Sequence, residues 1–160
     1  MTLVKFAAFN AGLRYLSGRS VNSIKDVSGT ASYYGNAGTA YMMFPFYGET
    51  AQTNVSGLNS VGDYCFVASD NSNVQPTEYA VPNTIGTVTV TSKSATGKGA
   101  TYVLTVSGTQ GDTITSLYFI KRVYNSANYQ KNWLIYALVL DSPVTIDSTG
   151  TANFTFAIEF

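Results

Sequence analysis

The end of the chain alternates strictly between two kinds of side chain, and this constrains the fold more than any other feature of the sequence. Large or apolar side chains occupy every second position, namely Ala152, Phe154, Phe156, Ile158 and Phe160. Successive side chains of a strand point to opposite faces of a sheet, so the pattern predicts a strand with one buried and one mostly polar face. Phe154 and Phe156 should lie in the core and Thr155 outside it.

Other runs rich in β-branched and aromatic residues precede this strand, with glycine- and serine-rich turns between them. The predicted strands are Asp63–Ala68, Ile85–Ser92, Thr101–Ser107, Thr113–Tyr124, Trp133–Leu140 and Val144–Ile146, with a hairpin loop at Lys93–Ala100. Thr113–Tyr124 does not alternate strictly, which a bulge or burial of both faces would explain. The sequence therefore predicts an all-β fold. We expect one antiparallel β-sandwich domain over residues 1–160, with a jelly roll as the favoured form.

The start of the chain predicts the exception to this pattern. Apolar residues recur near helical spacing from Leu3 to Leu16, and Gly18 supplies a C-cap. We expect residues 1–18 to form a short amphipathic helix that covers one end of a sheet, or an arm that docks on a neighbouring subunit.

Charge limits the partners that the surface can bind. Nine basic and nine acidic residues cancel, and charged residues make up only 11% of the chain. Binding to phosphates depends on clustered Lys and Arg, so we expect no nucleic-acid partner. The first residues lack a run long enough to span a membrane and lack a signal-peptide layout, so we expect cytoplasmic synthesis and no membrane partner. Neutral surfaces repel one another weakly, which favours a protein packed in an assembly.

The residue types present exclude several kinds of catalysis. The chain has no histidine and a single cysteine, Cys65, so Ser-His-Asp and Cys-His nucleophiles are excluded. A glycosidase needs only two carboxylates, but turn capping explains Asp112, Asp141 and Asp147. The loop Ser69–Asn83 carries oxygen ligands without the spacing of an EF-hand. We expect no enzymatic activity, no catalytic residues, no cofactor and no metal site.

Sugar binding is an open alternative. Tyrosines and Trp133 on a β-sandwich can stack on sugar rings while Asn and Asp side chains bind hydroxyl groups. The competing interpretation places these aromatic residues in the core or in an interface.

Two parts of the chain resemble small virion structural proteins of tailed bacteriophages. The first is Asn10-Ala11-Gly12-Leu13, and the second is Tyr136-Ala137-Leu138, followed by Asp141-Ser142-Pro143-Val144-Thr145-Ile146 and Phe154-Thr155-Phe156. The resemblance covers both ends and, more weakly, the middle from Thr113. It implies a virion component made in the host cytoplasm, either a capsid decoration (cement) protein that stabilises neighbouring capsomers or part of a tail fibre or its adaptor. Its partners would be the major capsid protein or other virion proteins.

The absence of heptads or repeated β-units favours decoration over a fibre shaft. With so few charges, exposed apolar runs would be costly, so we expect a homo-oligomer, with a trimer as the favoured symmetry. The residues predicted to contact another subunit or the shell lie in two runs: Phe6, Phe9 and Leu13, and Tyr41, Met42, Phe44 and Phe46. Burial within the chain is the alternative for both runs.

Overall fold

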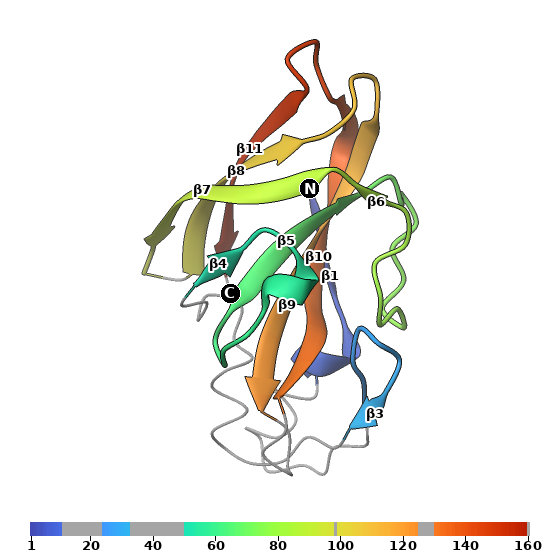
Figure 1. Ribbon diagram of the computed structural model, residues 1–160, viewed down its shortest axis with the longest axis vertical. Coiled ribbons are helices and arrows are strands. Elements are labelled where there is room, and N and C mark those ends of the chain that lie inside the picture. The colour runs from blue at the N-terminus through green and yellow to red at the C-terminus, as the bar shows by residue number, and fades with distance from the viewer. Residues whose placement is uncertain (11–23, 33–49, 98, 125–129, 160) are drawn as a thin grey trace.

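The computed structural model describes residues 1–10, 24–32, 50–97, 99–124 and 130–159, and these form two packed sheets (Figure 1). The larger sheet has the order β1 (Thr2–Lys5), β10 (Gln130–Thr145), β9 (Thr113–Tyr124), β5 (Tyr64–Ser69) and β4 (Ala51–Gln52), and β6 (Thr84–Ile85) also pairs with β5. The smaller sheet has the order β11 (Thr151–Glu159), β8 (Gly99–Ser107) and β7 (Thr87–Ala95). A separate hairpin joins β2 (Ile24–Lys25) to β3 (Ala31–Ser32), and a 3₁₀ helix covers Val55–Gly57.

The pairing is antiparallel apart from β4 with β5, so the predicted all-β antiparallel sandwich is confirmed. Strand β8 pairs with β11 in the smaller sheet, and β9 pairs with β10 in the larger one. Because β9 and β10 lie between β8 and β11 in the sequence, one antiparallel pair is nested inside the other. Such nesting is part of the jelly roll that the sequence favoured. Strands β7 and β8, however, form a hairpin within one sheet.

The main core lies between the sheets and is strongly aromatic. On β11, Ala152, Phe154, Phe156 and Ile158 are buried and the residues between them are not, which confirms the register predicted for this strand. Phe156 meets Phe66 of β5 with ring centroids 5.7 Å apart, and Phe119 of β9 stacks on Tyr136 of β10 at 4.7 Å. Large rings buried in such edge and stacked contacts supply much of the stability of the sandwich.

The larger sheet is buried on its other face too. A second apolar cluster there contains Phe6, Leu58, Cys65, Val74, Tyr118, Ile120, Leu134 and Ala137. Adjacent residues of β9, such as Tyr118 and Phe119, therefore both lie in cores, on opposite faces. This is why Thr113–Tyr124 does not alternate, and burial on both faces is the explanation that holds.

Strand β10 differs from the prediction. The two expected runs, Trp133–Leu140 and Val144–Ile146, are joined in one strand that spans Gln130–Thr145. The predicted turn at Ser142-Pro143 is instead a break in the β9–β10 register, between Val139 and Val144. Proline has no amide donor for the ladder, so a bulged stretch accommodates it without ending the strand.

The hairpin β7–β8 is longer than predicted, because most of Lys93–Ala100 belongs to its strands. Thr96 N donates to Gly99 O at 2.8 Å and closes the turn. A register shift between Val90 and Ser92 inserts one extra residue, Thr91, into β7. After this bulge Lys93 lies opposite the buried Tyr102, and its Nζ sits 5.0 Å from the Tyr64 ring centroid.

The predicted short N-terminal helix is present, but it begins only at Ala7. Thr2–Lys5, which were expected to belong to it, form a strand paired with β10. Leu3 and Val4 both pack against apolar clusters, on opposite faces of the sheet, so part of the supposed helical stripe is strand alternation. Leu13, Leu16 and Gly18 lie outside the described residues.

Two turns between consecutive strands, β2–β3 and β10–β11, share one sequence pattern, Asp-x-(Ser/Thr)-Gly-Thr. In residues 26–30, Asp26 Oδ1 accepts from Ser28 N at 3.0 Å, Ser28 Oγ at 2.6 Å and Thr30 N at 2.9 Å. In residues 147–151, Asp147 Oδ1 accepts in the same way from Thr149 N at 2.8 Å, Thr149 Oγ1 at 2.6 Å and Thr151 N at 3.3 Å. The glycine has a positive φ in both turns, +83° at Gly29 and +77° at Gly150, where other residues are strained.

No helix within the described part of the chain is both long and apolar enough to cross a membrane.

Candidate binding surfaces

Within the described part of the chain, Tyr79 is the large aromatic side chain that is exposed at the surface. It lies in the loop between β5 and β6 and is 41% exposed. A hollow of about 260 Å³ on one side of the loop is lined by Phe6, Ala7, Ala8, Ile24, Lys25, Thr77, Glu78, Tyr79 and Leu134. A shallow groove of about 420 Å³ is lined by Gln75, Thr77, Glu78, Tyr79, Ala80, Val81 and Pro82. Tyr79 lines both depressions, so its ring could serve as a binding platform.

A polar network fixes the loop that carries Tyr79. The Tyr118 hydroxyl donates to Glu78 Oε2 at 2.8 Å, and Asn71 Nδ2 donates to Glu78 Oε1 at 3.0 Å. Asn71 Nδ2 also donates to the Tyr118 hydroxyl oxygen at 2.9 Å. Burial and the bond to the Glu78 carboxylate raise the pKa of Tyr118, so it stays a neutral donor. The network ties the loop to β9, inside the second apolar cluster.

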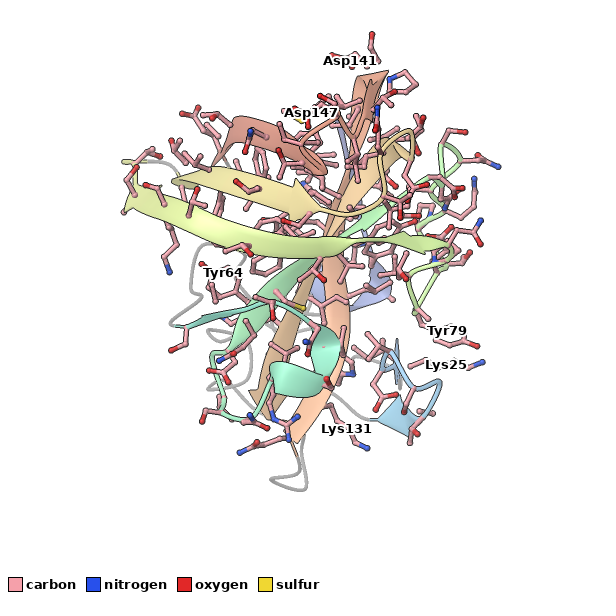
Figure 2. The ribbon with its side chains drawn as sticks, turned by 45° about the horizontal axis from the view of Figure 1, so that its top comes forward. Lys25, Tyr64, Tyr79, Lys131, Asp141 and Asp147 are labelled. Atoms are coloured by element: carbon pink, nitrogen blue, oxygen red, sulfur yellow. The ribbon has the colours of Figure 1, made fainter. Side chains whose placement is uncertain are left out.

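The β2–β3 hairpin covers part of the Tyr79 ring. Lys25 Nζ lies 5.0 Å from the ring centroid, and Figure 2 shows the two side chains next to each other at one side of the molecule. A Cβ placed on Gly29 would lie 3.3 Å from Tyr79 Cε2. Tyr79 therefore also anchors this hairpin through cation–π and van der Waals contact, which is a structural explanation of its position.

The outer face of the smaller sheet is the second candidate surface. Its outward side chains form four rows of three across β7, β8 and β11, which we call the hydroxyl face. The rows are Thr87, Ser107 and Thr151; Thr89, Thr105 and Asn153; Ser92, Val103 and Thr155; and Ser94, Thr101 and Ala157. Within the second row, Thr105 Oγ1 lies 2.7 Å from Asn153 Oδ1. No member of the hydroxyl face is charged.

Several carboxylates have structural roles. Asp26 and Asp147 hold the two related turns, and Asp63 Oδ2 accepts from Asn59 N at 3.0 Å and Ser60 N at 2.9 Å. Asp141 pairs with the N-terminal ammonium group of Met1. Turn capping thus accounts for Asp147, as predicted, whereas Asp141 lies within β10 and forms an ion pair instead of capping the predicted turn.

Other residues singled out from the sequence lie in the core. Phe6 and Phe9 are 1% and 5% exposed, so the chain itself covers both rings, which is the intrachain alternative for that run. Trp133 is fully buried and cannot serve as a sugar-stacking surface. Cys65 is buried as well, and this burial raises its thiol pKa to about 12. Leu13, Tyr41, Met42, Phe44 and Phe46 lie outside the described residues.

The loop considered for calcium has other bonds instead. Asn71, Asn73 and Glu78 bond to one another, to Tyr118 and to Gln75. No cluster of three or more acidic, cysteine or histidine ligands occurs among the residues that the structure describes.

The sequence did not single out Tyr79, because exposure of one tyrosine in a polar loop leaves no periodic signal. Threonines alternate with apolar residues in the sequences of β7 and β8, but only the strand order shows that β11 extends the face they form. Comparisons of the chain with protein-family models, with curated proteins and with solved structures found no match.

Proposed function

We propose that the protein is a non-enzymatic structural component of a virion, of the capsid decoration (cement) kind, which binds neighbouring capsomers of the major capsid protein. The resemblance of its two ends to small virion proteins supports this proposal, and the single observation in the fold that carries it is the hydroxyl face. The four rows of that face offer hydrogen-bonding groups across all three strands and contain no charged residue, and a charge, Glu159, stands beside them at the end of β11.

The chemistry of the hydroxyl face suits a contact with a protein shell. The centres of protein interfaces are depleted in charged residues, and hydroxyl groups can bond to backbone and amide groups of a partner. A symmetric shell repeats the same patch many times, so a modest contact per copy is sufficient for attachment. Because the face is uncharged, we expect attachment that changes little between low and high salt.

Add-back to particles that lack the protein tests this proposal. Thr105→Lys places a charge at the middle of the hydroxyl face, and Ser148→Lys places the same charge in the exposed β10–β11 turn as the matched control. We expect Thr105→Lys to weaken co-sedimentation with particles by about tenfold or more, while the control binds like the wild type. Equal binding of both variants, at equal thermal stability, would exclude the hydroxyl face as the contact.

Antibody labelling of the same particles in negative stain separates head from tail. Label over the capsid supports decoration, whereas label on the tail supports the fibre or adaptor alternative. Label on neither would remove the virion proposal.

A second candidate function, carbohydrate binding, is favoured by Tyr79 and its two depressions. Its ring is exposed beside Gln75 and Glu78, side chains of the kind that bind sugar hydroxyls. A glycan array with the wild type, Tyr79→Phe and Tyr79→Ala tests it. We expect Tyr79→Phe to keep binding through the ring and Tyr79→Ala to lose it. An array without signal for the wild type would contradict this function.

A further inference from the structure

The outer edge of β11 differs from the other sheet edges. It is nine residues long and pairs with β8 at every residue without a register shift. At the edges of the larger sheet, β1 has four residues and β4 only two. Strand β7 carries a bulge, and it also packs against β4 and β5. Short strands and bulges are devices that protect an edge, and β11 has neither.

The side chains of β11 do not protect its edge either. The strand contains no proline, no glycine and no lysine, and its one charged residue, Glu159, stands at its end. Among the described residues, only those of β8 pair with it as a strand, and Asp147 also bonds to the backbone of Thr151 at its start. The inner side chain of Phe154 keeps 9% exposure, whereas its partner Leu104 on β8 is fully buried. An unpaired row of backbone groups beside incompletely covered apolar side chains is a template for another strand.

We propose that β11 pairs with β11 of a second copy of this chain, antiparallel and around a two-fold axis at Thr155. This inference goes beyond the proposed function, since it concerns how two copies meet and holds outside a virion as well. The pairing would join two smaller sheets into one continuous six-stranded sheet and place their hydroxyl faces side by side.

The sequence of β11, TANFTFAIE, is suited to this register because it is nearly symmetric about Thr155. Phe154 of one copy lies opposite Phe156 of the other, on the inner face. Ala152 lies opposite Ile158, a small residue against a large one. Aromatic pairs across strands stabilise a sheet, and every inner residue meets another apolar residue.

Charge selects the antiparallel arrangement. It places Glu159 opposite Thr151 of the other copy, whereas an in-register parallel pair would place Glu159 beside Glu159. Like charges directly opposite each other destabilise a sheet. A second copy also satisfies the symmetry of an isologous contact, in which the same patch serves both partners. The two-fold pair predicts a dimer in place of the trimer that the sequence favoured.

Introduction of a charge at the axis tests the proposal with the purified full chain. Thr155→Lys places two lysines opposite each other at the two-fold axis, and Thr155→Glu does the same with two carboxylates. Thr89→Lys is the control, since it adds the same charge to the same face on the opposite edge strand. Sedimentation velocity at micromolar concentrations then reports the mass of each species against the 17.1 kDa chain.

We expect a dimer for the wild type and for Thr89→Lys. For each Thr155 variant we expect the dissociation constant of the dimer to rise at least about tenfold. An equimolar mixture of Thr155→Lys and Thr155→Glu should restore the dimer, which loss of folding could not do. A monomeric wild type, or an oligomer that both Thr155 variants leave intact, would overturn the proposal. Particle binding is absent from this experiment, so its outcome is independent of the proposed function.

Discussion

The two Asp-x-(Ser/Thr)-Gly-Thr turns adopt the same conformation in opposite surroundings. Asp26 is 4% exposed, Val27 N of its turn donates to Asn132 O at 2.9 Å, and Lys131 Nζ lies 3.6 Å from Asp26 Oδ2. Asp147 is exposed, in the β10–β11 turn, far from Lys25 and Lys131, which flank the other turn (Figure 2). The local sequence is therefore sufficient to set the turn, and the surroundings set how much the fold depends on it.

Among variants of the two turns, removal of the buried Asp26 carboxylate should lower the free energy of unfolding most. Asp26→Ala leaves the amides of Ser28 and Thr30 without their acceptor and Lys131 without its counter-ion. We expect a loss of about 2–4 kcal/mol in the free energy of unfolding, measured by urea denaturation. Asp26→Asn keeps an acceptor oxygen and should lose less. If Asp147→Ala cost as much as Asp26→Ala, burial would not distinguish the turns.

The glycines should respond equally, because their requirement comes from the turn itself. Gly29→Ala and Gly150→Ala each place a Cβ at a positive φ, and each Cβ meets an atom at 3.3 Å. We expect each variant to lose about 1–2 kcal/mol of unfolding free energy. A cost at Gly29 several times that at Gly150 would mean that the contact with Tyr79, and not the backbone, sets the requirement.

The ion pair of the buried turn should contribute less. Lys131→Met removes the ammonium group near Asp26 but keeps most of the side-chain volume. The Lys131 side chain is 25% exposed, so solvent screens the pair, and we expect a loss of about 1 kcal/mol. High salt should reduce this difference between wild type and variant, and a difference unaffected by salt would point to lost packing instead.

Replacement of the exposed Asp147 should change stability least, and the change should depend on pH. Hydrogen bonds from the Thr149 hydroxyl and from the amides of Thr149 and Thr151 lower the pKa of Asp147 below its ordinary value of 3.8. A lowered folded-state pKa stabilises the protein above that value, and the gain disappears as pH falls through the folded-state pKa. We therefore expect Asp147→Asn to be slightly less stable than wild type at pH 7 and equally stable well below pH 3.8. Urea midpoints at both pH values measure this, and a difference that grew in acid would contradict it.

These turns also show what the sequence could predict. Asp147 was predicted to open a turn, because it precedes Ser-Thr-Gly between two clear strands. Asp26 has the same pattern but lies in a Ser-, Asn- and Gly-rich stretch without clear strand patterns on either side, so its turn escaped prediction. Comparison of the two pentapeptides would have found it. The partners of Asp26 on β10 could not be predicted, since nothing local in the sequence brings Lys131 to residue 26.

Among the strands, too, some features could be predicted from the sequence and others could not. Alternation predicted β11 correctly because one face of it is polar. It failed at Leu3–Lys5, where the strand and the following helix together resemble one helical stripe. Tyr79 escaped prediction because its position depends on Tyr118 and Asn71, which only the folded chain brings to Glu78.

The bulge at Thr91 limits how the length of the chain can change. It shifts the alternation of β7, so that Ser92 faces outward and Lys93 inward over the Tyr64 ring. Because Thr91 is the extra residue of the bulge, its deletion would leave Ser92 opposite Val103 and Lys93 opposite Tyr102, with both side chains on their present faces. A single insertion after the bulge would instead exchange the two faces for the later residues of β7. Deletion at the bulge should therefore be tolerated, and single insertions beyond it should be rejected.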